Sequence, residues 1–245
     1  MNLSFGARRA GVALMTALAL PFALQAQEAQ IRKALEQIPN FPKIDEVRET
    51  PVPGLYEVRY AASEIVYSDA KGEYLFSGSL LRAKTMENLT EARLDRLAAI
   101  AFDDLPLGDA LVIKQGSGAR RLAVFVDPNC GYCKRFERDL VNVKDLTVYA
   151  FLMPILGPDS QAKARNIWCS KDPAKAWRGW MIDGATPPTA MGRCDAAALD
   201  RNVEFGRKHR ITGTPGLVFE DGKRQAGAIP AATLEKLLGE AARKS

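Results

Sequence analysis

Apolar residues recur in three short strand-like runs in the first half of the chain, most regularly where Glu57 and Arg59 alternate with apolar neighbours. A segment with helical spacing, residues 27–37, precedes these runs. We therefore predict a small antiparallel sheet in a unit of residues 27–84, with strands Leu55–Tyr60, Glu64–Tyr67 and Glu73–Ala83. A sheet of this size has an open edge that can pair with a second chain, so we interpret the unit as a dimerisation domain. Packing of the sheet on the rest of the same chain explains the pattern equally well.

Residues 85–118 are predicted to form a linker helix and a junction. Apolar residues have helical spacing over Thr90–Phe102, and Thr90 is placed to cap the helix. A short segment, Leu111–Lys114, follows. Residues 115–118 contain two glycines and a serine, which is typical of an exposed junction between domains.

The second half, residues 119–245, predicts one α/β domain. Leu122–Val126 is continuously apolar, as expected for a buried central strand. The predicted order is strand, helix, strand, a mostly helical insertion over residues 159–209, two more strands and a closing helix. The other expected elements are a helix from Cys130 to Val141, strands Leu146–Met153, Gly216–Glu220 and Lys223–Ala226, and a helix over Pro230–Arg243. Core residues expected in the insertion are Trp168, Trp177, Trp180 and Met181.

The first 26 residues are predicted to be a cleavable export signal. Arg8 and Arg9 precede an apolar stretch, residues 10–24, that is too short to span a bilayer. A basic start, an apolar centre and a small residue before the cut, here Ala26, are typical of secretory signals. A buried N-terminal helix is the alternative. Export would place the cysteines in an oxidising compartment.

Composition narrows the possible functions. The chain has 245 residues, of which 47% are hydrophobic and 26% charged, as in ordinary globular proteins. A formal net charge of +5 is weakly basic and gives no reason to expect a nucleic-acid partner. The single histidine disfavours a Ser-His-Asp triad or a histidine-rich metal site. We expect no cofactor.

Two of the four cysteines form a CxxC motif, Cys130-Gly131-Tyr132-Cys133, directly after the predicted central strand. Cys130 would lie at a helix N-terminus, where free N–H groups and the helix dipole stabilise a thiolate. We therefore predict that Cys130 attacks disulfides and that Cys133, one turn further along, resolves the mixed disulfide. This prediction requires that Cys130 be accessible to solvent.

Cys169 and Cys194 are the remaining pair if the CxxC cysteines pair locally, and their bond would stabilise the fold by roughly 3 kcal/mol. Two alternatives for the CxxC motif are a zinc site, which the wide spacing of Cys169 and Cys194 disfavours, and a structural Cys130–Cys133 disulfide, whose small ring favours reduction over stabilisation. Thr214-Pro215 enters a predicted strand, and a cis peptide bond or an ordinary trans turn would fit there. The loop could offer backbone groups to an extended substrate.

These motifs, in this order, resemble the DsbC/DsbG family of periplasmic thiol:disulfide interchange proteins. The resemblance rests on the CxxC motif, residues 167–172 and 194–195, Gly213-Thr214-Pro215, and the N-terminal segments 67–69 and 76–78. It implies a thioredoxin-like catalytic domain, a cis Pro215, and a Cys169–Cys194 disulfide. It also implies substrate contacts by Tyr132, Thr214 and Pro215, and a homodimer that binds misfolded exported proteins. A DsbD-like membrane reductase would keep Cys130 and Cys133 reduced.

We therefore predict a periplasmic disulfide isomerase. A monomeric thiol oxidase and a non-enzymatic holdase chaperone are the alternatives. A dimer in solution and a reduced CxxC pair would favour the isomerase over the oxidase. A holdase would keep its activity without the two active-site cysteines.

Overall fold

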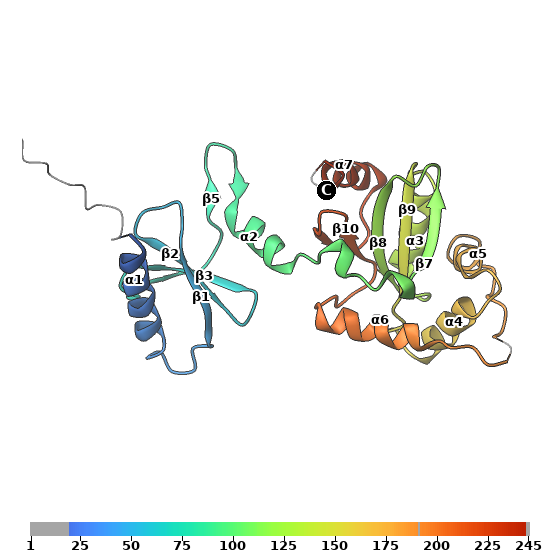
Figure 1. The fold of residues 1–245 in the computed structure, drawn as a ribbon, viewed down its shortest axis with the longest axis horizontal. Coiled ribbons are helices and arrows are strands. Elements are labelled where there is room, and N and C mark those ends of the chain that lie inside the picture. Colours follow the sequence, from blue (N-terminus) through green and yellow to red (C-terminus); the bar gives the residue numbers. More distant parts are fainter. Residues whose placement is uncertain (1–19, 191, 244–245) are drawn as a thin grey trace, which may run out of the picture. The chain divides into compact units, whose positions relative to one another are not determined.

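The computed structural model describes residues 20–190 and 192–243, which form two compact units that divide between Ala92 and Arg93. Figure 1 shows the elements of each unit in chain order. Residues 1–19, most of the predicted export signal, lie outside the described residues, and α1 begins at Leu20 within the remainder. Among the described helices, none is both long enough and apolar enough to cross a bilayer.

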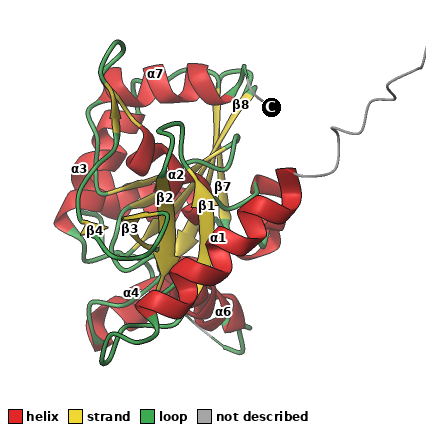
Figure 2. Cartoon of the chain, turned by 90° about the vertical axis from the view of Figure 1, so that its left-hand side faces the viewer, coloured by secondary structure: helices red, strands yellow, loops and turns green. Residues whose placement is uncertain are grey.

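The N-terminal unit is a four-stranded antiparallel sheet with a helix lying across it (Figure 2). The strands pair in chain order, β1-β2-β3-β4. Ile31 and Leu35 of the helix are fully buried and share one apolar cluster with Val58 at the centre of the sheet. The elements are α1 (Leu20–Leu35), β1 (Ile44–Glu49), β2 (Leu55–Tyr60), β3 (Glu64–Asp69) and β4 (Leu75–Phe76).

The predicted third strand of this unit, Glu73–Ala83, is wrong. The Asp69 carboxylate accepts hydrogen bonds from three backbone N–H groups of residues 71, 73 and 74, and this turn ends β3. Only two residues then pair with β3, as β4. A second fragment, β5 (Leu81–Arg82), pairs instead with β6 (Glu87–Asn88) in a separate two-stranded sheet.

The helix that follows is shorter than predicted and has a different cap. It spans α2 (Leu89–Ala98), and the Asn88 side chain accepts a hydrogen bond from Glu91 N at 3.1 Å. Thr90, the predicted cap, lies within the first turn. Its hydroxyl instead pairs with the Tyr67 hydroxyl and accepts from Leu80 N at 2.8 Å. The start of α2 is therefore bound to the sheet.

The C-terminal unit is built on a five-stranded sheet of order β11-β10-β8-β9-β7. Strands β8 and β9 are parallel, and every other pair is antiparallel. Its strands are β7 (Leu111–Gln115), β8 (Arg120–Val126), β9 (Leu146–Leu152), β10 (Gly216–Phe219) and β11 (Arg224–Ala226). Its α-helices are α3 (Gly131–Leu140), α4 (Pro158–Trp168), α5 (Pro173–Arg178), α6 (Ala197–Lys208) and α7 (Ala231–Ala241). Shorter turns are η1 (Phe102–Asp104), η2 (Leu107–Asp109) and the π-helical η3 (Gly179–Asp183).

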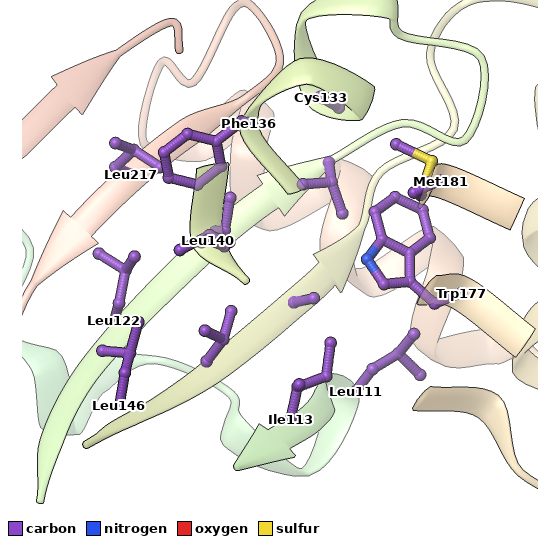
Figure 3. Close-up of a cluster of buried hydrophobic side chains, with 14 of the residues drawn as sticks. Leu111, Ile113, Leu122, Cys133, Phe136, Leu140, Leu146, Trp177, Met181 and Leu217 are labelled. Carbon is purple, nitrogen blue, oxygen red and sulfur yellow. The ribbon is translucent and has the colours of Figure 1, made fainter. Parts of the chain in front are cut away.

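The central strand β8 is buried on both faces, as the apolar run predicts. Leu122 and Val124 face a cluster that includes Phe136 and Leu140 of α3, and Figure 3 shows this cluster. Their neighbour Phe125 faces the opposite cluster, which includes Phe151. Because side chains alternate along a strand, β8 holds apolar layers on both faces of the sheet.

The structure changes two predictions for this unit. The short segment predicted at Leu111–Lys114, within the expected linker and junction of residues 85–118, is part of the edge strand β7 (Leu111–Gln115) and so belongs to the sheet. The predicted helical insertion is present as α4, α5, η3 and α6. Within it Trp177 and Met181 are buried as expected, whereas Trp168 and Trp180 are only partly buried against the core.

Candidate active site

Cys130 stands at the start of α3, immediately after the turn that ends the buried strand β8. It is the N-cap residue of the helix, and its Sγ accepts a hydrogen bond from Cys133 N at 3.2 Å. The Cys130 thiol also lies 3.2 Å from the backbone oxygen of Thr214, to which it can donate. The unpaired N–H groups of the first turn and the helix dipole favour negative charge on this sulfur.

The two cysteines of the motif are both free but differ in their access to solvent. Cys130 keeps 5% of its surface exposed, and Cys133 keeps none. Burial, and then the hydrogen bond with Cys130, raise the pKa of the Cys133 thiol well above its ordinary value. Cys133 is therefore held protonated inside the core, and Cys130 is the member of the pair that keeps some exposed surface. The prediction requires an accessible Cys130, and the exposed surface that this residue keeps is small.

Asp127 fixes the turn before Cys130, and its side chain is completely buried. One carboxylate oxygen accepts from Asn129 N at 2.7 Å and from the Ser160 hydroxyl at 2.7 Å. The other accepts from Ile155 N at 2.8 Å and Leu156 N at 2.9 Å. Asp127 thus joins the active-site turn to the loop after β9. The sequence predicted only a turn at this position.

The Thr214–Pro215 peptide bond is cis, which answers the question that the sequence left open. Gly216 follows as the first residue of β10 and pairs with Phe125 of β8. A side chain at Gly216 would meet Ile211 at 2.7 Å, so glycine lets the chain enter the sheet here. The loop thereby carries the Thr214 carbonyl to the Cys130 sulfur.

Three large apolar side chains are exposed around the active-site turn. One lies within the CxxC motif, and the other two lie in the loop after β9 that Asp127 binds to this turn. Tyr132, between the two cysteines, is 70% exposed. Ile155 and Leu156, whose N–H groups are bound by Asp127, are 41% and 55% exposed. Sequence reasoning named Tyr132 but missed the other two, because only the fold brings their loop to the active-site turn.

Cys169 and Cys194 form a disulfide, as predicted, with a Cα–Cα distance of 5.9 Å. The bond joins the end of α4 to the segment before α6. These two sulfurs are bonded to each other, so the zinc site that would need all four thiolates cannot form in this state.

A buried carboxyl group lies one helical turn beyond Cys133. Glu137 of α3 is 3% exposed and accepts a hydrogen bond from Trp177 Nε1 at 2.7 Å. Burial raises the pKa of Glu137, although the Trp177 hydrogen bond and the nearby Arg178 oppose that shift. Figure 3 shows Trp177 beside Met181 in the same apolar cluster as Cys133. The sequence analysis did not single out Glu137.

The cysteine pair at a helix start, facing a cis-proline loop on a five-stranded sheet, places this unit in the thioredoxin-like class of thiol–disulfide exchange proteins. A family model described as a thioredoxin-like domain matches residues 107–242. A second, described as the N-terminal domain of disulfide bond isomerase protein, matches residues 22–91. The chain belongs to the DsbC family of thiol:disulfide interchange proteins.

The sequences of named relatives align with most of the chain. The probable thiol:disulfide interchange protein DsbC of Bordetella pertussis is 44% identical over 192 residues, which are 78% of this chain and 67% of that protein. DsbC of Escherichia coli is 27% identical over 223 residues, or 88% of this chain and 89% of that one. A crystal structure of a disulfide interchange protein from Neisseria gonorrhoeae is similar with a TM-score of 0.52 and 38% identity, covering 56% of this chain and 97% of that chain.

Proposed function

We propose that the protein is a disulfide isomerase in which Cys130 is the attacking thiol. The Cys130 thiolate attacks one sulfur of a wrong disulfide in a client protein. A new S–S bond forms between Cys130 and that sulfur, and the second client sulfur leaves as a thiolate. When a different client thiolate attacks the mixed disulfide, a new client disulfide forms and Cys130 is released as a thiolate. No net oxidation or reduction takes place.

Cys133 is proposed to provide the escape from a mixed disulfide that does not rearrange. After losing its proton, Cys133 attacks the Cys130 sulfur, so that the client leaves reduced and the two cysteines become a disulfide. An external dithiol must then reduce this disulfide, and a DsbD-like membrane reductase is the proposed source. The buried, protonated state of Cys133 supports this order, because it makes resolution slower than the first attack.

The observation that carries the proposal is the setting of the Cys130 sulfur. Only this member of the pair has exposed surface, and it lies at the N-terminus of α3 beside the Thr214 carbonyl. We further propose that the cis-proline loop meets the backbone of an extended client segment, with Tyr132, Thr214 and Pro215 as the contacts. The exposed Tyr132 supports binding of an unfolded, apolar client.

The N-terminal unit is proposed to form the homodimer. Its edge strand β4 pairs with β3 on one side. Leu75 and Phe76 of β4 are 40% and 53% exposed, and the adjoining Tyr74 is 65% exposed. Three consecutive exposed apolar residues at a sheet edge are suited to pairing with a second copy. The family match over residues 22–91 supports this assignment. We also propose that residues 1–26 direct export and that the protein works in the periplasm.

Refolding of a scrambled multi-disulfide protein tests the proposal. The wild-type protein should restore the native disulfides, and Cys130→Ala should abolish this activity. Cys133→Ala should retain a part of the activity but accumulate mixed disulfides. Full activity in Cys130→Ala would contradict the proposal. Prevention of aggregation by the Cys130→Ala/Cys133→Ala protein, without any isomerisation by the wild type, would favour the holdase alternative, and a monomeric mass would favour the oxidase.

A further inference from the structure

Trp180 contacts the active-site turn from the helical insertion. It lies in η3, a single π-helical turn of the kind that often occurs at functional sites. Its indole N–H donates a hydrogen bond to the backbone oxygen of Pro128 at 2.6 Å. Pro128 is two residues before Cys130, so the ring of Trp180 is fixed relative to the turn that carries the reactive sulfur.

Two lysine ammonium groups lie against this ring. Lys134 Nζ is 4.0 Å from the ring centroid and Lys163 Nζ is 5.0 Å from it, within the range of cation–π attraction. Lys163 is also ion-paired with Asp159, which in turn accepts a hydrogen bond from the Asn129 side chain at 2.7 Å. The charge of Lys163 is therefore balanced by a carboxylate.

Lys134 differs from Lys163 in this respect. Within the part of the chain that the structure describes, it forms no ion pair with a carboxylate, and Trp180 is the group that holds its ammonium. Lys134 N donates a hydrogen bond to the backbone oxygen of Cys130 at 3.1 Å, so the two residues lie one helical turn apart at the start of α3. Since the same ring is bound to the Pro128 carbonyl, Trp180 holds the Lys134 ammonium beside the turn that leads to Cys130.

We propose that Trp180 is a positioning residue that holds the Lys134 ammonium where its charge stabilises the thiolate of Cys130. This inference rests on the proposed role of Cys130 as the attacking sulfur. The negative charge on Cys130 exists in the reduced protein and disappears when the Cys130–Cys133 disulfide forms. A fixed cation therefore makes Cys130 more reactive near neutral pH and favours the reduced state of the pair.

The rate at which iodoacetamide alkylates Cys130 tests this inference, in a Cys133→Ala background that leaves one free thiol. The rate is measured as a function of pH. Lys134→Met should slow alkylation at mildly acidic pH by about five-fold, the size expected for a single partly exposed charge at a helix end. Trp180→Leu should have a similar effect, and both should move the pH profile to higher pH. Lys134→Arg, which keeps the positive charge, should react at the parent rate.

Three further variants separate positioning from a general loss of structure. Lys175→Met removes an exposed lysine from α5 and should leave the rate unchanged. Trp180→Phe keeps an aromatic face and should retain most of the Lys134 effect. In the double variant Lys134→Met/Trp180→Leu, the second substitution should add nothing, because Trp180 acts through Lys134.

The inference is overturned if Lys134→Met alkylates within about two-fold of the parent, or if the two substitutions slow the reaction additively. A parent protein whose Cys130 does not react with iodoacetamide would instead contradict the proposed function itself. A reactive parent with an unresponsive Lys134 contradicts only the role of the Trp180–Lys134 pair.

Discussion

Substitution of Asp127 by Asn tests whether this buried carboxylate holds the active site together. The carboxylate accepts four hydrogen bonds, two on each oxygen, because both oxygens of an ionised carboxylate are acceptors. An asparagine offers one oxygen and one NH₂ group in the same space. Because two backbone N–H groups approach one side, the oxygen must face Ile155 and Leu156, and the NH₂ group then meets Asn129 N–H.

The magnitude follows from the bonds that change. The Ser160 hydroxyl can rotate and accept from the new NH₂ group, but the bond to Asn129 N is lost. The hydrogen bonds from Ile155 N and Leu156 N remain, but their acceptor becomes a neutral amide oxygen. Since a hydrogen bond to a charged group is worth about 1.5–3 kcal/mol and a neutral one about 1 kcal/mol, the free energy of unfolding should fall by about 3–6 kcal/mol. The turn before Cys130 should also lose its fixed geometry.

Urea unfolding followed by circular dichroism measures the stability, and refolding of a scrambled protein measures the activity. Both should fall in Asp127→Asn. The matched control is Asp145→Asn, because the Asp145 carboxylate also accepts from a backbone N–H and a hydroxyl, both of Ser117, but is exposed. The control should be nearly as stable as the wild type. An Asp127→Asn protein with a loss below about 1 kcal/mol and full activity would refute the reasoning.

Three other substitutions give separate tests. Burial raises the pKa of Glu137, so the folded protein binds a proton at this group more tightly than the unfolded chain does. The free energy of unfolding therefore falls as the pH rises above about 4.5. Glu137→Gln should flatten this fall, measured by urea unfolding between pH 4 and 8, and an unchanged pH dependence would contradict the prediction. Cys169→Ser/Cys194→Ser opens a loop of 25 residues and should lower the free energy of unfolding by about 3 kcal/mol, and an unchanged urea midpoint would show that the bond adds no stability. Phe76→Asp should be a monomer in analytical ultracentrifugation. The control Val112→Asp, which also places a charge at an exposed apolar strand residue, should stay dimeric. Equal behaviour of the two variants would show that β4 is not in the interface.

The elements predicted from the sequence are those whose pattern of apolar and polar residues matches the pattern of buried and exposed positions in the structure. The continuously apolar Leu122–Val126 is the fully buried centre of β8. Strand β1 was missed because its inward-facing residues, Ile44 and Val47, are three positions apart and not two. A register shift between Ile44 and Glu46 turns both side chains into the core, and that irregularity hides the alternation of a strand.

The opposite error was made at Tyr74, Leu75 and Phe76. Their apolar character predicted a long strand, but only Leu75 and Phe76 pair with β3, and all three side chains remain exposed. An apolar run indicates that a surface is to be covered. It does not say whether the covering surface belongs to the same chain.

In the candidate site too, some residues were predicted from the sequence and others were not. The CxxC motif and the Thr214–Pro215 loop were predicted because short motifs carry their chemistry. The roles of Asp127, Glu137 and Trp180 were not predicted, because each depends on contacts across more than 25 residues of sequence. For Asp127 a signal did exist, since an acidic residue directly after a wholly apolar strand must find several donors if it is buried.

Mapping the mixed disulfide formed with a client tests the central claim most directly. The Cys133→Ala protein is mixed with a scrambled client that contains non-native disulfides, free thiols are blocked in acid, and the cross-linked peptides are identified by mass spectrometry. The account predicts that Cys130 is the sulfur joined to the client, and that Cys130→Ala yields no such adduct. Adducts on Cys133 in the Cys130→Ala protein, at a rate equal to those on Cys130, would contradict it.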